Sequence, residues 1–224
     1  DERVHAAKGA RRLQLKNSMD AKFNKIVIPI GQALIEPAQQ QYLNADAFFW
    51  NVTFHEVAHG LGVKQTINGK GTVDQAMGDQ KTSWEEAKAD IVGLYLVNTL
   101  IDMGEITGIS KEESITTFIG GIVRSVRFGA ASSHGKANMM CYNYMEEHKA
   151  FTRNEDGTYH IDFEKALECV NSWAELVLTT QGDGNYEFAK AYAAEHANIG
   201  EALAADVAKV NALGIPRDIR FDFV

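Results

Sequence analysis

Residues 45–60 read Ala45-Asp46-Ala47-Phe48-Phe49-Trp50-Asn51-Val52-Thr53-Phe54-His55-Glu56-Val57-Ala58-His59-Gly60. This stretch is rich in apolar residues and predicts a helix with a broad apolar surface. Asn44 or Asp46 could be its N-cap, and Gly60 or Gly62 could end it, because these residue types favour the two ends of helices. A helix with this much apolar surface is expected to be buried, so the fold should be built around it.

Two histidines near the end of this helix suggest a metal site. Positions i and i+4 lie on the same face of a helix, so His55 and His59 could bind one ion together. The pattern His-Glu-x-x-His is typical of zinc hydrolases, in which the carboxylate, here that of Glu56, lies beside the metal. The alternative is that His55 and His59 bind no metal and are ordinary histidines of the core and the surface.

The composition of the chain excludes several classes of protein. The chain has 224 residues, of which 45% are apolar and 23% charged, so it can bury a core as one domain. Its net charge of −8 argues against nucleic acid or an anionic membrane as the main partner, because both require a dense basic patch. The longest apolar run, residues 91–101, is too short to cross a membrane. Cys141 and Cys169 have no metal-type spacing, and a disulfide between them is possible but not suggested.

The chain begins at Asp1 without an initiator methionine or an apolar leader. We therefore expect residues 1–224 to be a single, mostly helical lobe that belongs to a longer polypeptide. A cytoplasmic location is favoured.

The remaining sequence predicts a mainly α fold with a small β hairpin. A second helix is expected over residues 83–97, with Trp84, Ala87, Ile91, Leu94 and Tyr95 on one side. Further helices are expected over residues 11–23, 115–128, 136–148, 163–180, 185–197 and 199–213. Asp156-Gly157 predicts a hairpin turn within residues 150–162, and residues 219–224 could pair as an edge strand.

Two segments are less defined. Residues 25–37 could be extended, because of their β-branched residues, or could form a helix with Pro29 in its first turn. Residues 64–81 are rich in Gly, Asn, Gln, Asp and Thr and predict an exposed connection or a loose helix start at the rim of the site.

A catalytic zinc needs a third protein ligand, which after two histidines is commonly a carboxylate from another helix. Glu86 is the preferred candidate, because Asp90 follows it on the same helical face and could accept the outer N–H of a ligand imidazole. Glu85 is the second candidate for the third ligand, because the residue four positions later is Ala89, which has no carboxylate to accept the outer N–H of an imidazole. Alternatively, Ser83 and Glu86 could form a capping box, which would leave Glu86 unavailable to a metal unless the helix starts earlier.

These residues predict a hydrolytic site. Zinc held by His55, His59 and Glu86 should lower the pKa of its water to about 7. Glu56 should take that proton and pass it to a leaving amine, so a peptide bond is the expected target.

Three blocks of sequence resemble the catalytic lobe of the dipeptidyl peptidase III family of zinc peptidases. They are His55-Glu56-Val57-Ala58-His59-Gly60, Glu85-Glu86-Ala87-Lys88-Ala89-Asp90, and Arg124-Ser125-Val126-Arg127-Phe128-Gly129 leading to His134-Gly135-Lys136-Ala137-Asn138. The resemblance implies a helical, zinc-bearing lobe of a two-lobed enzyme that removes dipeptides from the N-terminus of short peptides.

The resemblance also implies roles for single residues. His55, His59 and Glu86 would be the ligands of Zn2+, Glu56 the base, and Glu85 and Asp90 the outer partners of the ligands. His134 resembles the family histidine that helps to stabilise the transition state, although by its chemistry alone it could be an exposed loop histidine.

The chain departs from the family pattern in two ways. Better-known members have one more residue between the two histidines, so the helix is expected to be more regular here. The family's second lobe, which helps to hold the amino end of the peptide, has no counterpart in these residues. A zinc-stabilised binding or scaffold domain without activity of its own is therefore an alternative, and Glu56 favours the enzyme because a structural site needs no base.

Overall fold

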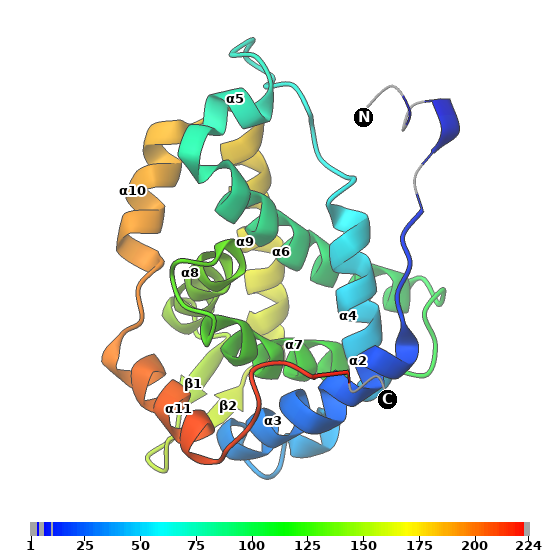
Figure 1. Ribbon diagram of the computed structural model, residues 1–224, viewed down its shortest axis with the longest axis vertical. Helices are drawn as coiled ribbons and strands as arrows, with labels where there is room; N and C mark the ends of the chain where they lie inside the picture. The colour runs from blue at the N-terminus through cyan, green and yellow to red at the C-terminus, as the bar shows by residue number, and fades with distance from the viewer. Residues whose placement is uncertain (1–3, 5–6, 10, 222–224) are drawn as a thin grey trace.

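In the computed structural model, which describes residues 4, 7–9 and 11–221, helix α6 (Lys81–Asp102) runs through the middle of the molecule (Figure 1). Its neighbours include α4, α7, α8 and α9. Trp84, Ala87, Ile91 and Leu94 are buried as predicted. Tyr95 was predicted on the same side but is 43% exposed, because helical periodicity fixes the direction of a side chain and not whether another element covers it.

The fold is mainly α, as the sequence predicts. The other helical segments are α2 (Lys16–Lys22), a π-helical turn (Phe23–Val27), α3 (Ile28–Leu34), a 3-10 turn (Gln40–Tyr42), α4 (Ala45–Ala58), α5 (Val73–Met77), a 3-10 turn (Gly78–Gln80), α7 (Lys111–Val126), α8 (Ser133–Glu147), α9 (Phe163–Gly182), α10 (Tyr186–His196) and α11 (Glu201–Ala212).

The segment that the sequence left open is helical. Pro29 lies in the first turn of α3, where the missing N–H of proline costs no hydrogen bond, so the extended alternative is wrong. The preceding helix was predicted from residue 11 but begins only at Lys16. Residues 64–81, predicted as an exposed connection or a loose helix start, include the short helix α5 and the 3-10 turn that leads into α6.

The hairpin within residues 150–162 is confirmed. Strands β1 (Phe151–Arg153) and β2 (Tyr159–Ile161) pair antiparallel, with Phe151 opposite Ile161. The predicted strand at the end of the chain is wrong for residues 219–221, which are not in a strand, and residues 222–224 lie outside the described residues. Cys141 and Cys169 are both buried free thiols, so no disulfide joins them.

Helices α4 and α6 approach each other unusually closely at Gly93. A Cβ atom added at Gly93 would lie 2.8 Å from the backbone nitrogen of His55 and 2.9 Å from the carbonyl carbon of Phe54. Real Cβ atoms do not come this close to backbone atoms, so the crossing requires glycine at this position. The contact fixes the end of α4 that carries the two histidines against the middle of α6.

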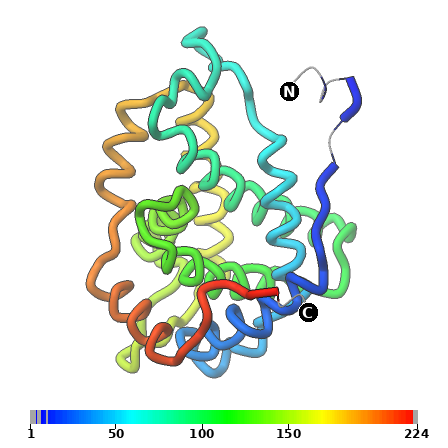
Figure 2. Tube along the Cα trace, viewed as in Figure 1, coloured from blue at the N-terminus to red at the C-terminus, as the bar shows by residue number. Residues whose placement is uncertain are grey.

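The C-terminal segment runs back across the molecule to helix α2 (Figure 2). Asp218 lies 3.5 Å from the ammonium of Lys22 on α2 and 3.6 Å from the guanidinium of Arg124 on α7. None of the helices in the described part of the chain is long and apolar enough to cross a membrane.

Candidate metal centre

Local sequence determines how α4 presents its two histidines. The Asn44 side chain accepts hydrogen bonds from the backbone N–H groups of Asp46 and Ala47, which makes it the N-cap, as predicted. The helix ends at Ala58, and His59 follows with helical backbone angles. His55 and His59 therefore keep i,i+4 spacing, and their Nε2 atoms lie 3.2 Å apart.

The start of α6 leaves Glu86 free to face these histidines. Ser83 donates its hydroxyl hydrogen to the carbonyl of Gln80, so it does not cap the helix together with Glu86. The capping box lies instead at α5, between Thr72 and Gln75. Because α6 begins at Lys81, Glu86 lies beyond the first turn of the helix, where the free backbone N–H groups that need a cap are found.

The carboxylate of Glu86 meets both imidazoles. Its Oε2 atom lies 3.4 Å from His55 Nε2 and 3.8 Å from His59 Nε2. Ligands at about 2.0–2.2 Å from a tetrahedral zinc ion lie about 3.3 Å from one another. The three atoms therefore already have nearly the separations of three corners of a zinc site.

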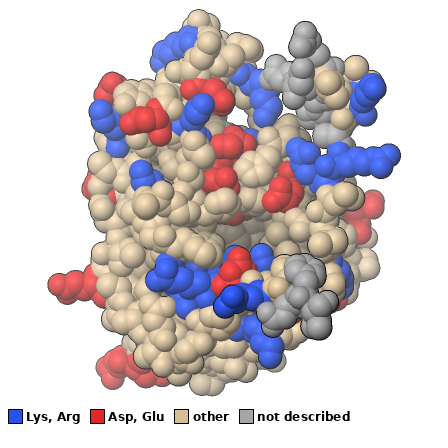
Figure 3. All heavy atoms as spheres, viewed as in Figure 1, with Lys and Arg blue, Asp and Glu red and all other residues tan. Residues whose placement is uncertain are grey.

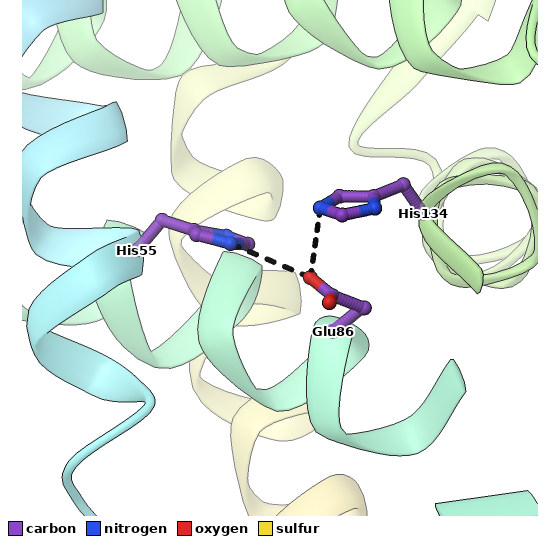
Figure 4. Close-up of side chains that lie close together, drawn as sticks. All are labelled: His55, Glu86 and His134. Atoms are coloured by element: carbon purple, nitrogen blue, oxygen red, sulfur yellow. Dashed lines mark ion pairs between the residues drawn. The ribbon is translucent and has the colours of Figure 1, made fainter. Parts of the chain in front are cut away.

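His134, at the start of α8, points at the same oxygen from the opposite side (Figure 4). Its Nε2 atom is 3.0 Å from Glu86 Oε2, and His55, Glu86 and His134 together could hold a metal ion. Glu86 Oε2 is nevertheless buried without a hydrogen-bond donor among the described residues. A buried, charged oxygen that lacks a donor and faces neutral nitrogen ligands fits a bound cation.

Each histidine of the His-Glu-x-x-His pattern has a carboxylate at its outer nitrogen. His55 Nδ1 is 2.7 Å from Asp90, and His59 Nδ1 is 3.1 Å from Glu85. A carboxylate at Nδ1 keeps the proton there and leaves the lone pair on Nε2, which is the arrangement found around metal-bound imidazoles. The sequence predicted this contact for Asp90 and placed Glu85 beside the ligands.

A further group holds each of these carboxylates. Asn138 on α8 donates to Asp90 at 3.0 Å. Lys88 donates to Glu85 at 2.8 Å and to the carbonyl of Leu61, also at 2.8 Å, although its side chain is only 2% exposed. Sequence reasoning missed both groups. The i,i+3 spacing of Glu85 and Lys88 could have indicated the lysine, but no local signal connects Asn138 with a residue 48 positions earlier.

The charges in the cluster shift one another's pKa values. Burial lowers the pKa of His55, but its hydrogen bond to Asp90 and the nearby negative charge of Glu86 outweigh burial and raise the pKa to about 10. Burial raises the pKa of Glu86, but His134 and His55 outweigh it and hold that pKa well below the usual range. The Glu86 carboxylate in turn raises the pKa of His134. In the absence of a cation, protons therefore balance the acidic charge of the site.

Glu56 points to a different neighbourhood from the other three acids. It is half-buried and lines a cavity of about 190 Å³ together with His55 and His134. Among the described residues its carboxylate has no hydrogen bond or ion pair, whereas its backbone carbonyl accepts one from Arg12. Acidic side chains gather near the middle of the face shown in Figure 3. Glu56 is thus free to exchange a proton with a molecule in the cavity.

Two solved structures share this fold over nearly the whole chain. DPP III from Caldithrix abyssi has a TM-score of 0.92 and 33% sequence identity, and the match covers 98% of this chain and 42% of that one. Dipeptidyl-peptidase III from Corallococcus sp. strain EGB has a TM-score of 0.91 and 32% identity, with 98% and 41% covered. In sequence and fold, the chain is similar to dipeptidyl peptidase III over nearly all of its own length. It corresponds to about two fifths of each dipeptidyl peptidase III chain.

A curated relative has a different name. Nudix hydrolase 3 from Arabidopsis thaliana is 34% identical over 223 residues, which is 98% of this chain but only 29% of the relative. This chain therefore matches less than a third of the length of that protein. No protein-family model matches the chain.

Proposed function

We propose that this chain is the metal-binding lobe of a zinc peptidase that releases dipeptides from the N-terminus of short peptides. The observation that carries the proposal is the convergence of His55 Nε2, His59 Nε2 and Glu86 Oε2 at 3.2–3.8 Å from one another. Two imidazoles and one carboxylate are a donor set of catalytic zinc, and a tetrahedral ion would keep a fourth position open. The similarity to two dipeptidyl peptidase III structures supports the same reaction.

Each residue of the site has a separate role in the proposed reaction. Zinc bound by His55, His59 and Glu86 would supply a Lewis acid beside the carbonyl and make water a stronger nucleophile. Glu56, whose carboxylate is free, takes a proton from the attacking water and transfers it to the leaving amine. His134, whose pKa is raised by Glu86, donates a hydrogen bond from Nε2 to the developing oxyanion. Asp90 and Glu85 hold the ligand imidazoles in the required tautomer.

The peptide site needs more chain than these residues. The solved relatives are more than twice as long as the matched part, because the match covers 41–42% of them. We infer that a second lobe of the same polypeptide completes the site and holds the amino end of the peptide. The alternative is a zinc-stabilised scaffold domain. It would have the same metal site, but it would not need Glu56 as a general base.

The test uses the parent protein, that is, the longer polypeptide that carries both lobes. It compares the hydrolysis of a dipeptidyl arylamide by the zinc-loaded parent protein and by its Glu56→Gln variant. We expect the variant to lose activity by about 10²–10⁴-fold, the usual contribution of a general base, with unchanged zinc content. Glu105→Gln, at an exposed position, is the matched control and should keep full activity. Equal rates for wild type and Glu56→Gln would disprove the role of Glu56. A parent protein that binds zinc but hydrolyses no peptide would favour the scaffold alternative.

A further inference from the structure

The cavity that Glu56 lines extends away from the metal centre between α4 and α7. On α4 it is lined by Phe48 and Val52, and on α7 by Phe118, Gly121 and Ile122. The spacings within each set, four on α4 and three or four on α7, are those of one helical face, so each helix presents a continuous stripe to the cavity. His55, Glu56 and His134 close the end nearest the reaction.

Three of the polar side chains in the wall, those of Asn51, Thr117 and Asn138, have hydrogen-bond partners within the chain. Asn51 donates to the carbonyl of Ser114 and accepts from the hydroxyl of Ser114. Thr117 accepts from the backbone of Asn44, and Asn138 donates to Asp90 and to the carbonyl of His134. A ligand that entered the cavity would therefore meet mainly apolar surface, because these polar groups have partners.

Arg124 also lies in the cavity wall. Its guanidinium lies 3.6 Å from Asp218 and 5.6 Å from the ring centre of Phe128, but its Nε atom is buried without a hydrogen-bond partner among the described residues. The apolar character of the cavity therefore comes from the stripes on α4 and α7 and not from Arg124. An acidic side chain is the alternative that the experiment has to exclude.

The size of the cavity is that of one large side chain. An apolar cavity of about 150 Å³ accommodates benzene. The volume here is about 190 Å³. Gly121 lies in the wall, and a Cβ atom added there would meet no atom of the described chain within 4 Å. The absence of a side chain at this position therefore leaves open space in the cavity.

We propose that this cavity binds the apolar side chain of the peptide residue on one side of the bond that is cleaved, and that Gly121 determines the size of side chain accepted. The inference rests on the proposed peptidase function for the reaction. It goes beyond that function in naming the substrate class: peptides with a large apolar residue, such as Phe or Leu, next to the cleaved bond. Small residues would leave the cavity partly empty, and acidic residues would lose hydration in it.

The experiment compares the parent protein with its Gly121→Leu variant on short peptides carrying Phe, Ala or Asp on either side of the bond. The added side chain should fill the cavity without displacing the chain, and leucine favours a helix more than glycine does. We expect kcat/KM for the Phe peptide to fall by about tenfold or more, with the Ala peptide within about threefold of wild type. Gly120→Ala is the control, because its Cβ would make ordinary contacts of 3.6–4.0 Å with Leu43, Gly31 and Val27, which lie outside the cavity wall.

Two outcomes would overturn the inference: an unchanged preference in Gly121→Leu, or a wild-type preference for Asp over Phe. Binding measured by calorimetry separates this inference from the proposed function. If the parent hydrolyses no peptide, tighter binding of the Phe peptide than of the Ala peptide, lost in Gly121→Leu, still supports the cavity. Equal binding by the two proteins overturns it.

Discussion

At the scale of single residues, four acids within one site differ in what each of them contacts. Glu86 Oε2 faces the inner nitrogens of three histidines, whereas Glu85 and Asp90 each contact the outer nitrogen of one histidine. Glu56 contacts none of these rings through its carboxylate. The four carboxylates can therefore take different roles. The role of each depends on whether it contacts an inner histidine nitrogen, an outer histidine nitrogen or neither.

The contacts of Glu86 and Glu85 predict a ranking of zinc affinities. Glu86→Gln should weaken zinc binding by more than about 100-fold, because it removes an anionic ligand. Glu85→Gln should weaken it by about 10- to 100-fold, the usual effect of losing a partner of a ligand histidine. Competition with a chelator of known affinity measures both constants. The reverse order would assign the third ligand to Glu85, and equal retention by both variants would place it elsewhere.

The raised pKa of His55 predicts that zinc binding releases protons. Because this pKa is about 10 in the absence of metal, His55 is protonated at neutral pH, and zinc has to displace that proton. The apparent affinity should therefore rise as the pH rises from 6 to 8, by roughly tenfold per pH unit for each proton displaced.

Calorimetry in two buffers with different ionisation enthalpies counts the protons released. Asp90→Asn is the control, because loss of the carboxylate removes the main cause of the raised pKa of His55, so fewer protons should be released. An affinity that does not change with pH would show that His55 is already neutral.

At the scale of helices, the site depends on the crossing of α4 and α6. Much of α4 was predictable, because the Asn44 cap and the apolar pattern are local in sequence. The buried position of Lys88 and the need for glycine at Gly93 were not predictable. Both depend on which neighbouring segment packs against α6, and a single sequence does not contain that information.

The crossing predicts a specific effect of Gly93→Ala. The methyl group would clash with the backbone at His55, so the fold should lose about 1–3 kcal/mol of unfolding free energy, the usual cost of overpacking. Zinc affinity should fall as well, because His55 must shift. Urea denaturation and chelator competition measure the two effects. Gly121→Ala, where the methyl group meets open space, should show neither loss; equal behaviour of the two variants would mean that the helices can separate freely.

At the scale of the whole molecule, the sequence predicted a mainly α fold with one hairpin, and the structure confirms it. The proximity of His134 to Glu86 arises only from tertiary structure, because 48 residues separate them and they belong to different helices. The family resemblance suggested a role for this histidine, whereas its local Ser-Ser-His-Gly sequence suggested nothing. Long-range contacts of this kind can be predicted only from resemblance to a known family or from a structure.

Zinc should stabilise the whole fold, because its proposed ligands come from two helices in the core of the molecule. At a free zinc concentration 1,000 times the dissociation constant, mass action adds about 4 kcal/mol. For a chain of this size that corresponds to a rise in Tm of roughly 8–16 °C. Differential scanning calorimetry with zinc, with magnesium and after chelation measures the shift. We expect magnesium to have little effect, and a zinc shift retained in Glu86→Gln would contradict the proposed ligands.

The close contact at Gly93 also bears on which cations the site accepts. With the backbone of His55 held against α6, the spacing between nitrogen and oxygen ligands is set by the fold before any ion arrives. Calcium takes 6–8 oxygen ligands at about 2.3–2.6 Å, whereas the atoms that converge here include two imidazole nitrogens, so we expect weak binding of calcium. Selectivity for a small ion that prefers nitrogen ligands would then depend on Gly93, whose side chain is a single hydrogen atom, although this residue of α6 does not contact the metal.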